Sequence, residues 1–127
     1  MSAPNLVNLT SIVPHTISIT PSDTNRTSLV AAPPTNSAHK VDQILIANID
    51  GTNSIAATVE LRLADGTTHR SLCYQLTVPA GSTVELLTRG TTLYLLDTSV
   101  TGEASTLWCT SGAASKLTFT CSYSTIS

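Results

Sequence analysis

Three cysteines could in principle act as nucleophiles, metal ligands or disulfide partners. Cys73, Cys109 and Cys121 are an odd number of cysteines, and none is paired at the two-residue spacing of zinc or redox motifs. We therefore predict buried, reduced thiols that pack as small hydrophobes. A disulfide between Cys109 and Cys121 is the minor alternative.

Three histidines could in principle assemble a metal site or supply a general base. His15, His39 and His69 are far apart in the sequence, and each lies next to a turn signal. We therefore expect exposed loop histidines and no metal site.

Paired carboxylates for acid–base catalysis would have to come from eight acidic residues. Asp50, Asp65 and Asp97 lie in predicted turns, where a carboxylate accepts backbone hydrogen bonds. Glu60 and Glu85 occupy outward positions of predicted strands, where solvent exposure is the ordinary outcome. The chain also lacks a GxSxG elbow and a glycine-rich phosphate loop. We predict no catalytic, cofactor-binding or metal-binding residues, and no enzyme activity.

The composition favours strands over helices. Charged residues make up 11% of the chain, against about 25% in an average domain. Serine and threonine together supply 38 of the 127 residues. Threonine is branched at Cβ and packs well on a pleated surface. A weakly charged, hydroxyl-rich surface also suits a molecule that packs against partners.

The charge pattern argues against nucleic acid as a partner. The net charge is −2, and the six basic residues are scattered singly, whereas phosphate binding needs a basic patch. No apolar run of 18 residues is present, so we expect no membrane partner. Residues 1–10 lack the pattern of a signal peptide, and we expect synthesis in a cytoplasm.

Residues 39–127 read as a series of strands separated by turns. Alternation of apolar and polar residues recurs every 8 to 12 residues, with turn signals such as Asp50-Gly51 and Asp65-Gly66 between the runs. In the predicted strand 71–78, one face carries Leu72, Tyr74, Leu76 and Val78, and Cys73 lies on the opposite face. The pattern predicts an all-β protein, an antiparallel β-sandwich of jelly-roll or immunoglobulin-like type. The predicted strands span 41–49, 57–63, 71–78, 83–87, 92–96, 104–109 and 116–123.

Residues 1–38 differ from the rest because they hold five of the six prolines. Proline lacks a backbone donor and is confined to edges and turns of sheets. This segment is predicted to be an extended arm or a set of edge strands that reaches a neighbouring subunit. Truncation before Thr20 is then expected to leave a folded sandwich that no longer assembles. The predicted interface residues are Leu6, Val7, Leu9, Ile12, Val13, Ile17 and Ile19.

Several short motifs in order resemble the small β-sandwich virion proteins of tailed bacteriophages. The first two are Ile46-Ala47-Asn48-Ile49-Asp50-Gly51-Thr52-Asn53 and the strand Ala57-Thr58-Val59-Glu60-Leu61. They are followed by the turn Val78-Pro79-Ala80, the strand Leu93-Tyr94-Leu95 and the C-terminal run Cys121-Ser122-Tyr123-Ser124-Thr125-Ile126-Ser127. The resemblance covers about two-thirds of the chain and leaves out the N-terminal segment and the connection from Thr98 to Ser105.

The resemblance implies a structural component of a phage particle, located in the virion and made in the host bacterial cytoplasm. Our first hypothesis is a capsid cement (decoration) protein that binds the major capsid protein and copies of itself, as a homotrimer. A neck, tail or fibre-associated protein is the alternative. A carbohydrate-binding module on the virion surface is weaker, because Tyr74, Phe119 and Tyr123 are predicted to lie on apolar faces.

Overall fold

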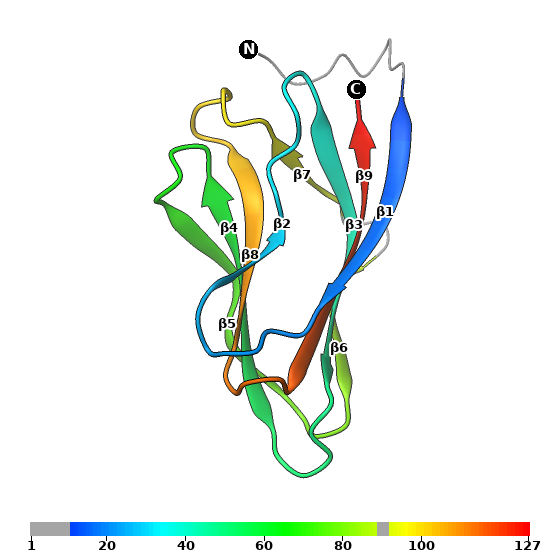
Figure 1. Cartoon of the computed structure of the whole chain (residues 1–127), viewed down its shortest axis with the longest axis vertical. Helices are drawn as coiled ribbons and strands as arrows, with labels where there is room; N and C mark the ends of the chain where they lie inside the picture. Colours follow the sequence, from blue (N-terminus) through cyan, green and yellow to red (C-terminus); the bar gives the residue numbers. More distant parts are fainter. Residues whose placement is uncertain (1–10, 89–91) are drawn as a thin grey trace.

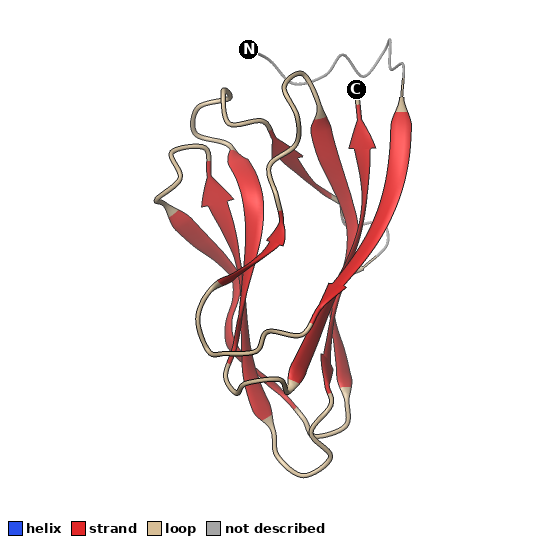
Figure 2. Ribbon diagram, in the orientation of Figure 1, coloured by secondary structure: helices blue, strands red, loops and turns tan. Residues whose placement is uncertain are grey.

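The computed structural model describes residues 11–88 and 92–127, and this part of the chain contains strands, turns and loops but no helix (Figure 2). The prediction of an all-β protein is confirmed. Each strand predicted within residues 39–127 is present, with ends shifted by three residues at most. The strands are β1 (Ile12–Ile19), β2 (Thr27–Val30), β3 (Ala38–Asn48), β4 (Ile55–Leu63), β5 (His69–Val78), β6 (Thr83–Leu87), β7 (Leu93–Leu96), β8 (Ala104–Ser111) and β9 (Leu117–Ile126).

The strands form two antiparallel sheets that face each other (Figure 1). The first sheet has the order β1-β9-β3-β6, and β7 also pairs with β3; the second has the order β2-β8-β4-β5. The chain changes sheet at each step from β1 to β4, and again between β5 and β6, β7 and β8, and β8 and β9. This connectivity is that of a jelly roll. An immunoglobulin fold instead keeps its first two strands in one sheet.

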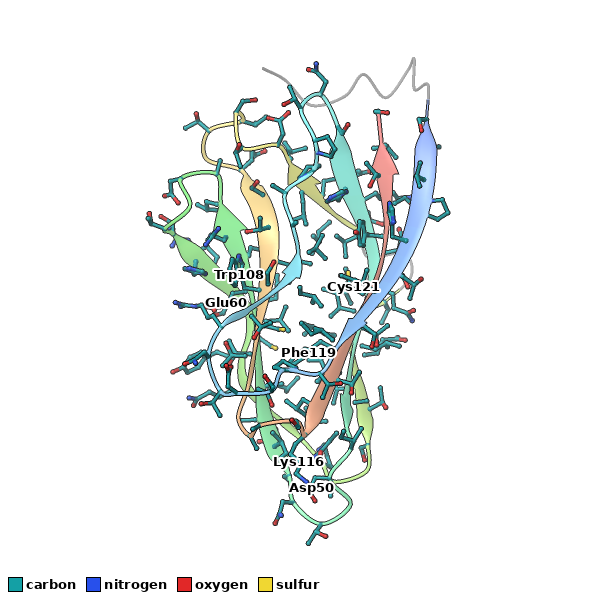
Figure 3. The ribbon with its side chains drawn as sticks, in the orientation of Figure 1. Asp50, Glu60, Trp108, Lys116, Phe119 and Cys121 are labelled. Carbon is teal, nitrogen blue, oxygen red and sulfur yellow. The ribbon has the colours of Figure 1, made fainter. Side chains whose placement is uncertain are left out.

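The core lies between the sheets and is built from alternating residues of the central strands. β9 turns Leu117, Phe119 and Cys121 inward, all fully buried. Figure 3 shows Phe119 and Cys121 between the sheets. β3 supplies Ile44 and Ile46 from the same sheet. The second sheet closes the core with Ala57, Val59, Val78, Leu107 and Cys109.

The turn that follows β3 is held by side chains. Asn48 is buried, and its amide donates to the carbonyls of Asn53 and Val78, each at 2.9 Å. Asp50 Oδ1 accepts the backbone N–H groups of Thr52 at 2.8 Å and Asn53 at 3.1 Å. The Asn48 side chain therefore holds the end of β3 beside the end of β5, where Val78 lies, and the Asp50 carboxylate closes the turn itself.

The two strands between residues 12 and 30 are part of the sandwich. β1 pairs with β9 along its whole length, and β2 pairs with β8. Both are edge strands, which is one of the two forms predicted for residues 1–38. β1 and β2 thus form one edge of each sheet and pair with strands of residues 39–127.

The side-chain pattern of β5 differs from the prediction because the strand contains bulges. Cys73 pairs with Val59 and faces the core, whereas Tyr74 is 72% exposed. The register against β4 slips on either side of Val59. Each extra residue shifts the alternation by one position, so the apolar residues of β5 do not share one face. The backbone at Gln75 is left-handed, with φ of 50°.

Candidate interaction surfaces

Four of the seven predicted interface residues fall in β1, and they divide into two pairs. Ile12 and Val13 are 62% and 47% exposed. Ile17 and Ile19 are half-buried and pack against the core of the same molecule. β9 and the core therefore already cover much of Ile17 and Ile19, and the interface role of the four residues stays a prediction. Leu6, Val7 and Leu9 lie outside the described residues.

Hydroxyl groups form a row of cross-strand pairs on the outer side of the first sheet. Its pairs join Thr16 to Ser122 at 3.3 Å, Ser18 to Thr120 at 3.2 Å, and Thr20 to Thr118 at 2.8 Å. These six residues, here called the hydroxyl face, alternate with the core residues of β1 and β9. The short side chains carry no charge, so this face can approach another surface without burying an ion.

An ion pair lies on the outer side of the second sheet. Arg26 donates to both carboxylate oxygens of Glu60, from Nε at 2.7 Å and from Nη2 at 3.2 Å. Glu60 points outward from β4 as predicted, but it is only 7% exposed. The hydrogen bond from Arg26 lowers the pKa of Glu60, and burial opposes it. The expectation of a solvated Glu60 is therefore wrong, because the guanidinium covers its carboxylate.

Trp108 is the centre of a second group on this side. It pairs with Glu60 across β8 and β4, and Figure 3 shows both residues on the second sheet, away from Phe119. The guanidinium of Arg62 lies 4.5 Å from the centre of the indole ring, and His69 meets it edge-on at 6.4 Å. The indole N–H donates to Thr106 at 2.9 Å. Trp108 is therefore held by neighbours of its own chain.

A pocket of about 340 Å³ opens beside the ion pair, and we call it the Tyr74 pocket. The loop before β2 contributes Arg26 and its two preceding residues, and β8 contributes Thr110. β4 contributes Thr58 and Glu60, and β5 contributes Tyr74 and Gln75. Sequence reasoning missed this site because the bulge that brings Tyr74 outward leaves no local signature.

The three thiols are free, and the two most buried ones are held in their protonated form. Cys109 and Cys121 have no exposed surface. Burial raises the pKa of each to about 12. The thiolate is the nucleophile and metal ligand, so neither residue is reactive at neutral pH. Cys73 is half-buried, and burial raises its pKa as well.

The histidines lie in strands, which corrects the expectation of exposed loops. His39 is buried in β3, whereas His15 in β1 and His69 in β5 are half-buried. His39 meets Tyr123 edge-on at 4.7 Å, and His15 stacks on the same ring at 4.9 Å. His39 Nδ1 is 3.0 Å from Oγ1 of Thr125. Burial lowers the pKa of His39, and repulsion by His15 adds to this effect.

We expect acid to destabilise the fold through His39. The unfolded chain binds a proton on this histidine near the ordinary pKa of about 6.5, whereas the folded chain binds it only at lower pH. The free energy of unfolding should therefore fall as the pH drops below about 6.5. Urea denaturation at pH 7.5 and pH 5.5 measures this difference. His39→Gln should reduce it, and an equal difference in the variant would assign the effect to other groups.

Within residues 11–88 and 92–127, no group of three or more histidine, cysteine, aspartate or glutamate side chains is placed to hold a metal ion. The same part of the chain contains no helix that is long and apolar enough to cross a membrane.

The fold and surfaces define a two-sheet β-sandwich with a polar outer pocket. The sequence matches no family model and no curated protein.

Several solved structures are similar to this chain at low sequence identity. A chain of the disulfide-linked pili of Bacillus endospore appendages is 13% identical, with a TM-score of 0.53 over 98% of this chain and 95% of that one. A chain of the T13 particle of infectious bursal disease virus is also 13% identical, with a TM-score of 0.41 over 89% of this chain. The Gx strain of that virus gives 13% identity and a TM-score of 0.43 over 91% of this chain. This chain spans only 31% of each of the two viral chains.

Proposed function

We propose that this chain is a structural protein of a tailed-phage particle, a capsid cement (decoration) protein that binds the major capsid protein and copies of itself as a homotrimer. The observation that carries the proposal is the hydroxyl face. Its three hydroxyl pairs tie the segment 16–20 to β9, and none of the six side chains carries a charge. Such a surface can be buried against repeated copies of a lattice without desolvating ions.

The exposed end of β1 supplies an apolar contact beside this face. Ile12 and Val13 project into solvent at the edge of the first sheet. Pro14 follows them and lacks a backbone donor, which limits uncontrolled pairing of this edge. The proposed contact therefore uses side chains and the hydroxyl face more than extension of the sheet.

The mechanism is stabilisation by binding. A subunit that contacts several shell proteins binds the assembled lattice and not its separate parts, so it shifts the equilibrium towards the shell. A stable contact of this kind buries about 1,200–2,000 Å² in total. The protein would be located in the virion after synthesis in the host bacterial cytoplasm.

The second candidate is a neck, tail or fibre-associated protein of the particle. The observation in its favour is the fold shared with the spore-appendage chain, which forms pili. A ring or fibre needs the same uncharged faces, but far fewer copies of the chain.

Copy number in the purified particle tests the proposal and separates the two candidates. Quantitative mass spectrometry should give a ratio to the major capsid protein near one for a cement protein. A few to a few dozen copies per particle would replace the cement role with a neck or tail role. Absence of the chain from purified particles would contradict both.

A further inference from the structure

We propose that the Tyr74 pocket binds a neutral saccharide, with a sugar ring stacked on Tyr74 and its hydroxyls hydrogen-bonded to the polar side chains around it. This site lies on the second sheet, and the inference is independent of the assembly role proposed for the first sheet. The pocket volume of about 340 Å³ lies within the range of small-molecule sites.

The exposed tyrosine provides the apolar part of the site. Tyr74 is 72% exposed, whereas Cys73 and Leu76 of the same strand are partly buried. The bulge opposite Thr58 turns it outward, and the N–H of Gln75 donates to Thr58 Oγ1 at 2.9 Å. An aromatic ring fixed on a strand offers a flat apolar face, which the C–H groups of a pyranose ring can cover.

The ion pair provides oriented hydrogen-bonding groups. A carboxylate offers about four acceptor sites and a guanidinium five donors. The pair uses two of each, and Arg26, whose side chain is 53% exposed, can still donate to a ligand. Gln75 and Thr110 add further donors and acceptors to the lining. The planar guanidinium of Arg26 and the planar amide of Gln75 can each bond two adjacent sugar hydroxyls.

The charges in the pocket indicate a neutral ligand. Arg26 and Glu60 are the charged residues of the lining, and they cancel each other. A phosphate site would need an excess of donors and positive charge, and an amine site an uncompensated carboxylate. A polyhydroxyl compound needs donors and acceptors together, as this lining provides.

The support of the site favours binding with little reorganisation. Five of its eight lining residues come from three neighbouring strands of one sheet, and three come from the loop before β2, where the bidentate contact with Glu60 fixes Arg26. A site held on strands loses little conformational freedom when the ligand binds.

The experiment titrates the full ¹⁵N-labelled chain with maltotriose, cellotriose, lactose and triacetylchitotriose, and follows the amide resonances by NMR. At least one sugar should give saturable shifts at Thr58, Gln75 and Thr110. Tyr74→Ala should weaken that binding by about tenfold or more, because it removes the stacking ring. Tyr74→Phe should keep most of the affinity.

Tyr94→Ala is the matched control, since Tyr94 is an exposed tyrosine in β7 of the other sheet. It should leave the affinity unchanged, and urea denaturation confirms that both alanine variants are folded. The proposal is overturned if none of the four sugars gives saturable shifts at the pocket. Equal losses in the two alanine variants, or stronger shifts with inorganic phosphate at the same residues, would also overturn it.

Discussion

Phe119→Ala should lower the free energy of unfolding by about 3–5 kcal/mol, the largest loss from a single substitution that we expect in this chain. Phe119 is the sole phenylalanine and is fully buried between the sheets. Its strand neighbours are Ile19 of β1 and Ile46 of β3, so the ring lies where three strands of the first sheet meet the second. Removing it leaves a cavity that the rigid sheets cannot close.

Urea denaturation followed by circular dichroism measures this loss. A domain of this size is stable by about 5–15 kcal/mol, so the variant should unfold at a much lower urea concentration with a similar slope. Tyr94→Ala is a control that removes an aromatic ring from an exposed position, and it should change the stability by about 0.5 kcal/mol or less. A loss below about 1 kcal/mol for Phe119→Ala would contradict the close packing of Phe119 between the sheets.

Deletion of residues 2–19 should prevent folding, which reverses the outcome expected from the sequence. The deletion removes β1 and exposes the edge of β9, the strand that carries Phe119 and Cys121 into the core. It also removes Ile17 and Ile19, which pack against that core. Circular dichroism and size-exclusion chromatography should show a chain without a cooperative transition. The shorter deletion of residues 2–10 retains every described strand and should preserve the transition.

Two point substitutions test the same strand without shortening the chain. Ile17→Asp places a carboxylate against the core and should cost more than about 2 kcal/mol of stability. Ser18→Asp changes the adjacent residue on the hydroxyl face, where the side chain is exposed, and should cost less than about 1 kcal/mol. Similar losses from both, or a folded chain after the longer deletion, would restore the view of β1 as a detachable arm.

The sequence by itself determined the strands and most of the turns. Alternation along Leu117–Tyr123 placed Phe119 and Cys121 inside, and both are fully buried. Asp50 and Asp65 marked turns, and each accepts backbone N–H groups of residues two and three positions later. These features are local, because a strand has a side-chain period of two and a short polar side chain bonds to its nearest backbone groups.

The tertiary structure decided which strands pair and what the surfaces expose. The hydroxyl face joins Thr16 to Ser122, and no local pattern specifies a pairing between positions so distant in the chain. The ion pair on Glu60 depends on a loop that precedes β2. The Tyr74 pocket depends on a bulge in β5, and one extra residue reverses the facing of every side chain beyond it. Periodicity is a property of one strand, whereas register is a relation between two.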